Sequence, residues 1–108
     1  MIMERIEQLT EFLKESPEDS FLQHALALEH AKRGQDAQAR RLFEQLLERD
    51  PGYVGSYYHL GKLLQRLHEP AAALRVYKKG LEMTAAVNDR HTYNELSTAL
   101  EDLMDETE

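Results

Sequence analysis

The sequence predicts an all-α fold, an α-α superhelix of stacked antiparallel helix hairpins with about six helices. The main observation is that the 108-residue chain nearly repeats itself at a shift of 34 residues. Six positions of the second copy fall on the same or similar residue types in the first: Pro51 on Pro17, Leu60 on Leu26, Gly61 on Ala27, Ala73 on Ala39, Tyr77 on Phe43 and Leu81 on Leu47. Composition agrees, because 42% hydrophobic and 31% charged residues with only 3 Pro and 5 Gly favour a helix-rich domain.

The first predicted helix covers residues 3–15 and forms half of a repeat. Its apolar residues lie on one stripe at helical spacing: Ile6, Leu9, Phe12 and Leu13. Pro17 cannot continue this helix but suits the first position of the next one, with Ser16 as its N-cap. We therefore expect a boundary at Ser16-Pro17.

The first full repeat is predicted over residues 18–50. Its first helix runs from about residue 18 to 33 and ends at Gly34, a residue typical of helix C-termini. Asp36 is then expected to cap a helix over 37–49, whose wide apolar face holds Ala39, Leu42, Phe43, Leu46 and Leu47. The turn Asp50-Pro51-Gly52 closes the unit.

The second repeat is predicted over residues 53–86. It consists of a helix over 53–67, a break at His68-Glu69-Pro70 and a helix that runs from Pro70 toward Val87. Small residues, Ala27 and Gly61, stand at the same slot of the two repeats. We expect them to let the paired helices approach closely.

A capping helix over residues 89–104 follows, and residues 105–108 are expected to fray. Asn88 and Asp89 are typical of a helix stop followed by an N-cap. The apolar stripe is narrower here: Leu96, Ala99, Leu100, Leu103 and Met104. A short array needs such a helix, apolar toward the stack and polar outward, for solubility. Residues 1–108 are thus expected to form a single domain.

Several of these features together resemble the tetratricopeptide repeat (TPR) family. They are the 34-residue period, the segment Tyr57-x-x-Leu60-Gly61, the pairs Ala39 with Phe43 and Ala73 with Tyr77, and the Asp50-Pro51 turn. The resemblance covers roughly residues 20–85 and implies a small bacterial-type TPR domain protein with about two repeats. The repeats are degenerate, because Gln23, His30 and Ala85 stand where the family usually has a bulky aromatic residue, Tyr and Pro.

The residues do not indicate an enzyme. With 0 Cys, disulfides, thiolate zinc sites and cysteine nucleophiles are excluded. The 5 His form no convincing pair, and the chain lacks His-Glu-x-x-His, nucleophile-elbow and phosphate-loop motifs. We predict no catalytic, metal-binding or cofactor-binding residue and no cofactor. A metal-dependent or small-molecule enzyme is the least favoured alternative.

Charge argues against nucleic acid or a membrane as the partner. The net charge is -7, and residues 91–108 carry six acids and no Lys or Arg, whereas both of those partners are recruited by concentrated basic residues. The N-terminal residues form neither a signal peptide nor a transmembrane span, so a cytoplasmic location is the default expectation.

The resemblance implies that the first helix of each repeat lines a concave groove. The groove residues would be Phe21, His24 and Leu28, then Tyr58, Lys62 and Gln65. Such a groove suits a peptide or helix with an apolar anchor and a nearby carboxylate. In a second interpretation, Phe21 and Leu28 are buried against the N-terminal helix. The slots that hold a chaperone's C-terminal carboxylate in some family members are occupied by His24, Leu28, His59, Asp89 and Tyr93, none of which matches.

The predicted function is therefore non-catalytic protein binding or assembly, as in a scaffold, with a protein or peptide partner of unknown identity. The alternative is a self-associating structural domain, a weak homodimer whose groove is not in use. Two repeats bury few residues, which motivates that alternative.

Overall fold

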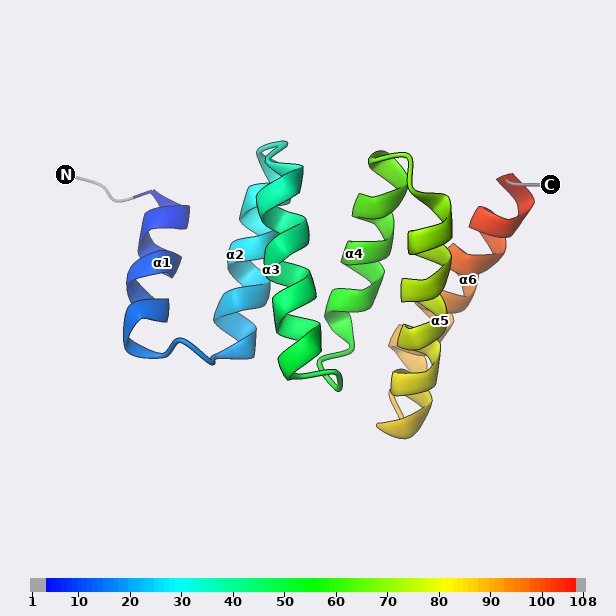
Figure 1. Cartoon of the computed structure of the whole chain (residues 1–108). Coiled ribbons are helices and arrows are strands. Elements are labelled where there is room, and N and C mark those ends of the chain that lie inside the picture. The colour runs from blue at the N-terminus through cyan, green and yellow to red at the C-terminus, as the bar shows by residue number, and fades with distance from the viewer. Residues whose placement is uncertain (1–3, 107–108) are drawn as a thin grey trace. The chain divides into compact units, whose positions relative to one another are not determined.

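The computed structural model describes residues 4–106, which form six α-helices and no strand (Figure 1). The predicted all-α class is confirmed. The chain divides into two compact units, residues 1–50 and 51–108, which are described separately below. Their union into a single domain stays a prediction.

The first unit contains three helices, α1 (Arg5–Glu15), α2 (Ser20–Lys32) and α3 (Asp36–Arg49). α2 packs against both α1 and α3. Each helix buries part of the stripe expected for it, and the buried residues are Leu9, Leu26, Ala27, Ala39, Phe43 and Leu46. Phe12, predicted on the apolar stripe of the first helix, is instead 56% exposed.

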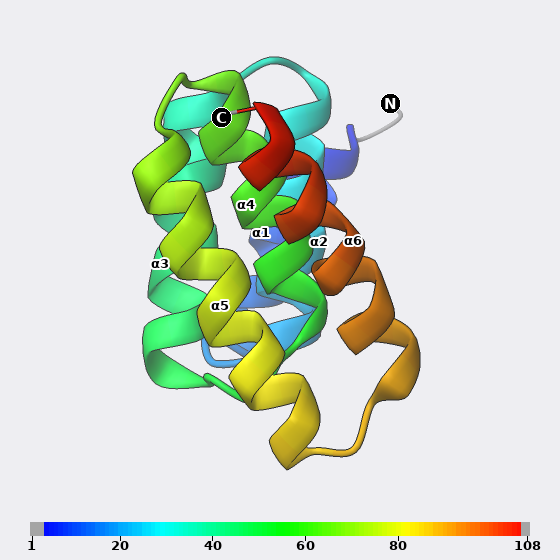
Figure 2. The same cartoon turned by 90° about the vertical axis from the view of Figure 1, so that its right-hand side faces the viewer.

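The second unit also contains three helices, α4 (Gly55–Arg66), α5 (Pro70–Ala86) and α6 (Arg90–Glu106). α5 packs against α4 and α6, and α6 also contacts α4 (Figure 2). α5 begins at Pro70 and ends next to Val87, as predicted. α6 buries Leu96, Ala99 and Leu103, whereas Met104 is 50% exposed.

The two repeats share their pattern of burial. The paired positions Leu26 and Leu60, Ala27 and Gly61, Ala39 and Ala73, Phe43 and Tyr77, and Leu46 and Gly80 are all buried. Leu42 and Val76, and likewise Leu47 and Leu81, are half-buried in both copies. The shift of 34 residues thus predicts which side chains of each hairpin face its interior.

Three helices end in the same hydrogen-bond arrangement, in which one residue takes the left-handed conformation. Those residues are Gly34 (φ 75°), His68 (φ 59°) and Asn88 (φ 60°). In each case the next backbone N–H donates to a carbonyl five residues before it: Gln35 to His30, Glu69 to Leu64 and Asp89 to Thr84. These bonds satisfy carbonyls that have no partner within the helix. The predicted stops at Gly34 and Asn88 are confirmed.

Helix starts differ from the predictions at two caps. α2 begins at Ser20, and its cap is Asp19, whose carboxylate accepts a 3.0 Å hydrogen bond from the Leu22 N–H. Ser16, predicted as that cap, instead ends α1 by donating its N–H to the Phe12 carbonyl. Asp36, predicted as the cap of α3, is its first helical residue, and Gln35 precedes it.

At the other end of the chain, α6 continues through Glu106. It therefore extends two residues into the segment 105–108 that was expected to fray, and the last two residues lie outside the described range. No helix between residues 4 and 106 combines the length and the apolar character needed to cross a membrane.

Candidate functional site

A pocket in the second unit lies between α4 and α6 and holds two of the predicted groove residues, Tyr58 and Lys62. Its volume is about 380 Å³. The rest of the lining comes from α6: His91, Asn94, Glu95, Thr98, Ala99 and Asp102. This size is at the lower end of the range of small-ligand pockets. Most of the residues that line the pocket are polar or charged, although the larger part of the exposed lining surface is apolar.

The α4 wall of the pocket consists of an aromatic ring with a cation above it. Tyr58 and Lys62 are four residues apart and therefore lie on the same face of the helix. The Lys62 Nζ atom is 5.6 Å from the centroid of the Tyr58 ring, within cation–π range. Within residues 4–106, Lys62 forms no ion pair. Its charge is therefore available to a ligand.

The α6 wall of the pocket is acidic and polar. His91, Glu95, Thr98 and Asp102 recur at spacings of four, three and four residues, which places them on one face of α6. His91 Nε2 lies 3.9 Å from Glu95 Oε1, in a pair whose His side chain is 87% exposed, so the interaction is weak. Two carboxylates thus face the pocket.

His59 lies beside the pocket as a neutral aromatic group. Its ring is edge-on to the Tyr58 ring, with centroids 5.5 Å apart. Desolvation lowers the pKa of His59, and the Glu95 carboxylate acts in the opposite direction. Because the net shift is downward, His59 is uncharged near pH 7 and adds no cation to this site.

Gln65, the third groove residue predicted in the second repeat, does not line this pocket. Its side-chain oxygen accepts a hydrogen bond from the Tyr77 hydroxyl. Burial raises the pKa of Tyr77, and Tyr58 and Glu106 raise it further, so the hydroxyl remains a donor. The contact joins α4 to α5, which gives Gln65 a structural role.

The remaining predicted groove residues lie on α2 in the first unit. Phe21 is 64% exposed, so the second interpretation, in which it is buried against the N-terminal helix, is wrong for this residue, whereas Leu28 is half-buried. His24 is also half-buried, and its ring meets the Phe43 ring edge-on at 5.8 Å. Partner binding by Phe21, His24 and Leu28 stays a prediction.

The α6 residues of the pocket were missed in the sequence because this helix was interpreted only as a cap. The sequence held no signal for them, because a polar outward face is also what a capping helix needs for solubility.

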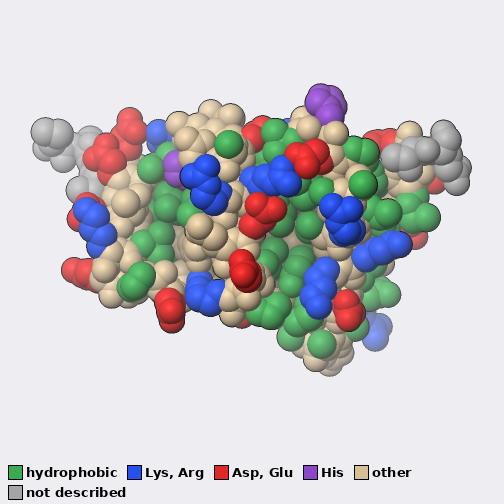
Figure 3. Space-filling view, in the orientation of Figure 1, with side chains coloured by type: hydrophobic (Ala, Val, Ile, Leu, Met, Phe, Trp, Pro, Cys, Tyr) green, Lys and Arg blue, Asp and Glu red, His purple; other side chains and the backbone are tan. Residues whose placement is uncertain are grey.

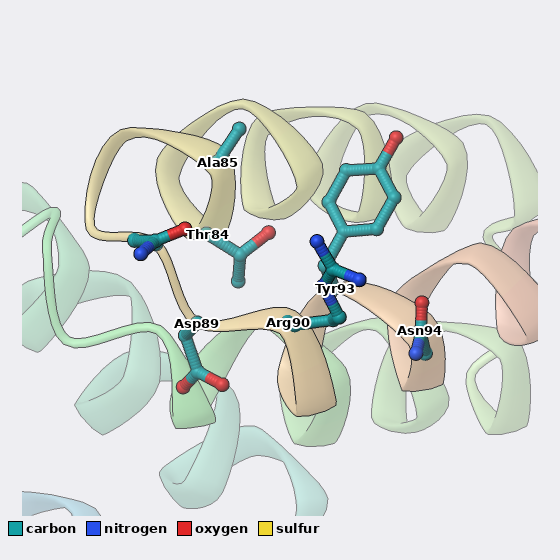
Figure 4. Close-up of a pocket in the computed structure, with 7 residues that line it drawn as sticks. Thr84, Ala85, Asp89, Arg90, Tyr93 and Asn94 are labelled. Carbon is teal, nitrogen blue, oxygen red and sulfur yellow. The ribbon is translucent and has the colours of Figure 1, made fainter.

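A second hollow of about 370 Å³ lies where α5 turns into α6. Figure 4 shows Arg90 and Tyr93 of α6 extending toward the side where Thr84 and Ala85 of α5 lie, whereas Asp89 points the other way. The Asp89 carboxylate accepts hydrogen bonds from the Thr92 N–H at 3.1 Å and the Thr92 hydroxyl at 2.8 Å. Asp89 therefore caps α6, as predicted.

Charged groups are interspersed on the surface. On the face shown in Figure 3, Lys and Arg side chains lie among Asp and Glu side chains and do not gather into one basic area. Among residues 4–106, no group of three or more His, Cys, Asp or Glu side chains has an arrangement that could hold a metal ion.

Comparison with known proteins shows the family. The tetratricopeptide repeat family model matches residues 20–63. A tetratricopeptide repeat domain protein from Salinibacter ruber is 41% identical, with 80% of this chain and 96% of that chain covered and a TM-score of 0.77. No curated protein matches the chain.

Two further solved structures share the fold over most of the chain. A protein from Bordetella parapertussis is 26% identical, covers 97% of this chain and 91% of its own, and has a TM-score of 0.84. The TPR2B domain of yeast Sti1, solved as a complex with pHsp70, is 23% identical, covers 94% of this chain and 81% of its own, and has a TM-score of 0.86. The chain belongs to the tetratricopeptide repeat family.

Proposed function

We propose that the chain is a non-catalytic protein-binding module and that the pocket between α4 and α6 holds a segment of its partner. The observation that carries this proposal is the α4 wall, where an accessible aromatic ring and a cation without an ion-pair partner in residues 4–106 lie side by side. Aromatic and cationic side chains in a pocket are typical anchors of protein interfaces.

The chemistry of that wall suits a particular kind of contact. The half-buried Tyr58 ring offers apolar surface to a side chain of the partner, and Lys62 offers a charge-assisted hydrogen bond to a carboxylate. The complex of the Sti1 TPR2B domain with pHsp70 supports a protein as the class of partner.

Affinity capture from cell extract, read by mass spectrometry, tests the proposal. A partner held by wild type should be lost or weakened at least roughly tenfold by Tyr58→Ala with Lys62→Glu. The matched control is Tyr93→Ala with Lys79→Glu, which makes the same chemical changes in the same unit away from this pocket. Equal retention of the partner by both double variants would place its binding elsewhere.

Self-association is the alternative function. In that case the partner captured on immobilised protein would be a second copy of the chain. Sedimentation over a range of concentrations separates the two functions, because a chain that stays monomeric when concentrated does not act as a homodimer.

A further inference from the structure

The two walls of the pocket carry opposite charge. On the α6 side, Glu95 and Asp102 face the pocket. The one Lys or Arg of α6 is Arg90, at the first position of the helix and outside the lining of this pocket. Lys62 stands on the opposite wall and forms no ion pair with either carboxylate. The α6 wall is therefore an acidic surface that a basic ligand would complement.

The spacing of the two carboxylates sets the spacing of their ligands. Glu95 and Asp102 are seven residues apart on α6, which corresponds to about 10.5 Å along the helix and nearly two full turns. An extended polyproline II segment has three residues per turn and rises about 3.1 Å per residue, so side chains three positions apart share a face about 9.3 Å apart. The two spacings agree to within the reach of a Lys or Arg side chain.

The pocket of about 380 Å³ lies between two helix walls and is open to solvent on one side. An extended chain can pass along such a hollow and place successive side chains against both walls.

We propose that this pocket selects an extended partner segment with two Lys or Arg residues three positions apart, which pair with Glu95 and Asp102. This inference rests on the proposed function of the pocket. The acidic α6 wall and the cationic α4 wall also orient the segment, because its basic side chains must face α6 and any acidic side chain must face Lys62.

Short synthetic peptides test the proposal directly. Four probes share one leucine and a proline-containing backbone: one has two arginines three positions apart, one has two glutamines there, one has two glutamates, and one has the two arginines adjacent. Titration of isotope-labelled protein followed by NMR locates and measures binding even when it is weak. The probe with spaced arginines should bind roughly 3- to 30-fold more tightly than the glutamine probe, because exposed ion pairs contribute modestly.

The pattern across the other probes should follow. The adjacent-arginine probe should be weaker than the spaced one, the glutamate probe weakest, and the differences should shrink as salt is raised. Amide shifts should centre on α4 near Tyr58 and on α6 between residues 94 and 102. Equal affinity for the arginine and glutamine probes, or no shift there with any probe, would overturn the inference.

Substitutions on α6 identify the carboxylates. Glu95→Gln with Asp102→Asn should abolish the preference for arginine, whereas Glu101→Gln with Asp105→Asn, the same charge change on the same helix outside the pocket, should keep it. Glu95→Lys with Asp102→Lys should transfer the preference to the glutamate probe. All four residues are exposed, so the fold should tolerate these changes. If both neutralised variants lost the preference for arginine, the preference would arise from the net charge of α6. That result would contradict the assignment of Glu95 and Asp102 as the pairing carboxylates.

The proposed function and this inference can fail separately. If Tyr58→Ala with Lys62→Glu releases the captured partner but Glu95→Gln with Asp102→Asn does not, the pocket binds protein and the basic selectivity is wrong. If neither double variant releases it, both proposals are wrong.

Discussion

At the scale of single residues, the two repeats differ at equivalent positions, but within each repeat the residues that contact one another are chemically compatible. In the second unit the Tyr77 hydroxyl donates to the Gln65 side chain. At the same slots, 34 residues earlier, the first unit has Phe43 and Ala31, which offer neither a donor nor an acceptor. The second repeat therefore has both hydrogen-bonding groups and the first repeat has neither. This is expected, because a buried polar group without a partner costs free energy.

A double-mutant cycle tests this coupling. Tyr77→Phe removes the donor and should lower the free energy of unfolding by about 1 kcal/mol. Gln65→Ala should have a similar cost. The double variant, which reproduces the chemistry of Phe43 and Ala31, should lose clearly less than the sum of the two single losses. Urea unfolding measures all three, and strictly additive losses would show that the two groups do not interact.

A second pair of positions also differs between the repeats in a coordinated way, and it includes the slot near the start of each repeat where the family usually has an aromatic residue. Tyr57 packs against Gly80, where an added Cβ would lie 2.7 Å from the Tyr57 Cβ, and the Tyr57 hydroxyl donates to the Pro51 carbonyl at 2.6 Å. The first unit has Gln23 and the larger Leu46 in these slots. There Arg49 donates to the Gln23 side chain at 2.6 Å and to the Glu18 carbonyl at 2.8 Å. A hydrogen-bond network thus replaces the aromatic anchor.

Gly61 is fixed by close approach, and a substitution pair in α4 tests this. A Cβ on Gly61 would overlap the Tyr77 ring, which is 0% exposed and has no room to move aside. Gly61→Ala should therefore destabilise the protein by about 1–3 kcal/mol through overpacking. Gly55→Ala in the same helix, where nothing lies within 4 Å of the new methyl group, should be neutral or stabilising. Thermal unfolding compares them, and equal effects would refute the packing explanation.

At the scale of helices, the periodic apolar stripes could be predicted from the sequence, and some of their ends could not. Gly34 and Asn88 each permit the left-handed conformation and so revealed where α2 and α5 stop. The start of α2 was misplaced because both Ser16 and Asp19 are good caps by residue type. Only the geometry shows that Asp19 reaches the Leu22 N–H.

The candidate site was predictable in part for a similar reason. Tyr58 and Lys62 followed from their place in the repeat, whereas the opposite wall required knowing that α6 contacts α4. The resemblance to the repeat family implies that Gln65 lies in the groove, but its hydrogen bond to α5 depends on tertiary packing that the sequence pattern does not contain.

The cap of α6 should make stability depend on acid. Hydrogen bonds from the Thr92 backbone and then from its hydroxyl hold the pKa of Asp89 below its ordinary value. Because the pKa of Asp89 is lower in the folded than in the unfolded protein, its ionised carboxylate stabilises the fold fully at a pH above the ordinary pKa. This stabilisation is lost as the pH falls through the folded-state pKa. Asp89→Asn keeps a capping side chain without an ionisable group. Its melting temperature should therefore fall less than that of wild type in acid, and parallel pH profiles would contradict this origin.

At the scale of the whole molecule, net charge bears on self-association. Two copies, each with a formal charge of -7, repel one another, and the repulsion is strongest at low ionic strength. We expect sedimentation velocity at low salt to show a monomer across the accessible concentration range. A fraction of dimer that rises with protein concentration even at low salt would favour the homodimer alternative over partner binding.

The matched exchanges between the repeats also constrain how such chains can be engineered. A longer array built by duplicating residues 51–84, one full 34-residue period, as an intact block would carry Tyr57 with Gly80, and Gln65 with Tyr77, in every copy. A consensus that mixes the two repeats position by position could instead place a tyrosine at the Tyr57 slot opposite a leucine, as at Leu46, where Gly80 leaves room for it. It could likewise place the Tyr77 hydroxyl opposite an alanine, as at Ala31, which cannot accept its hydrogen bond. The residues of one hairpin must therefore be exchanged together. Chimeras of such chains should be joined between hairpins and never within one.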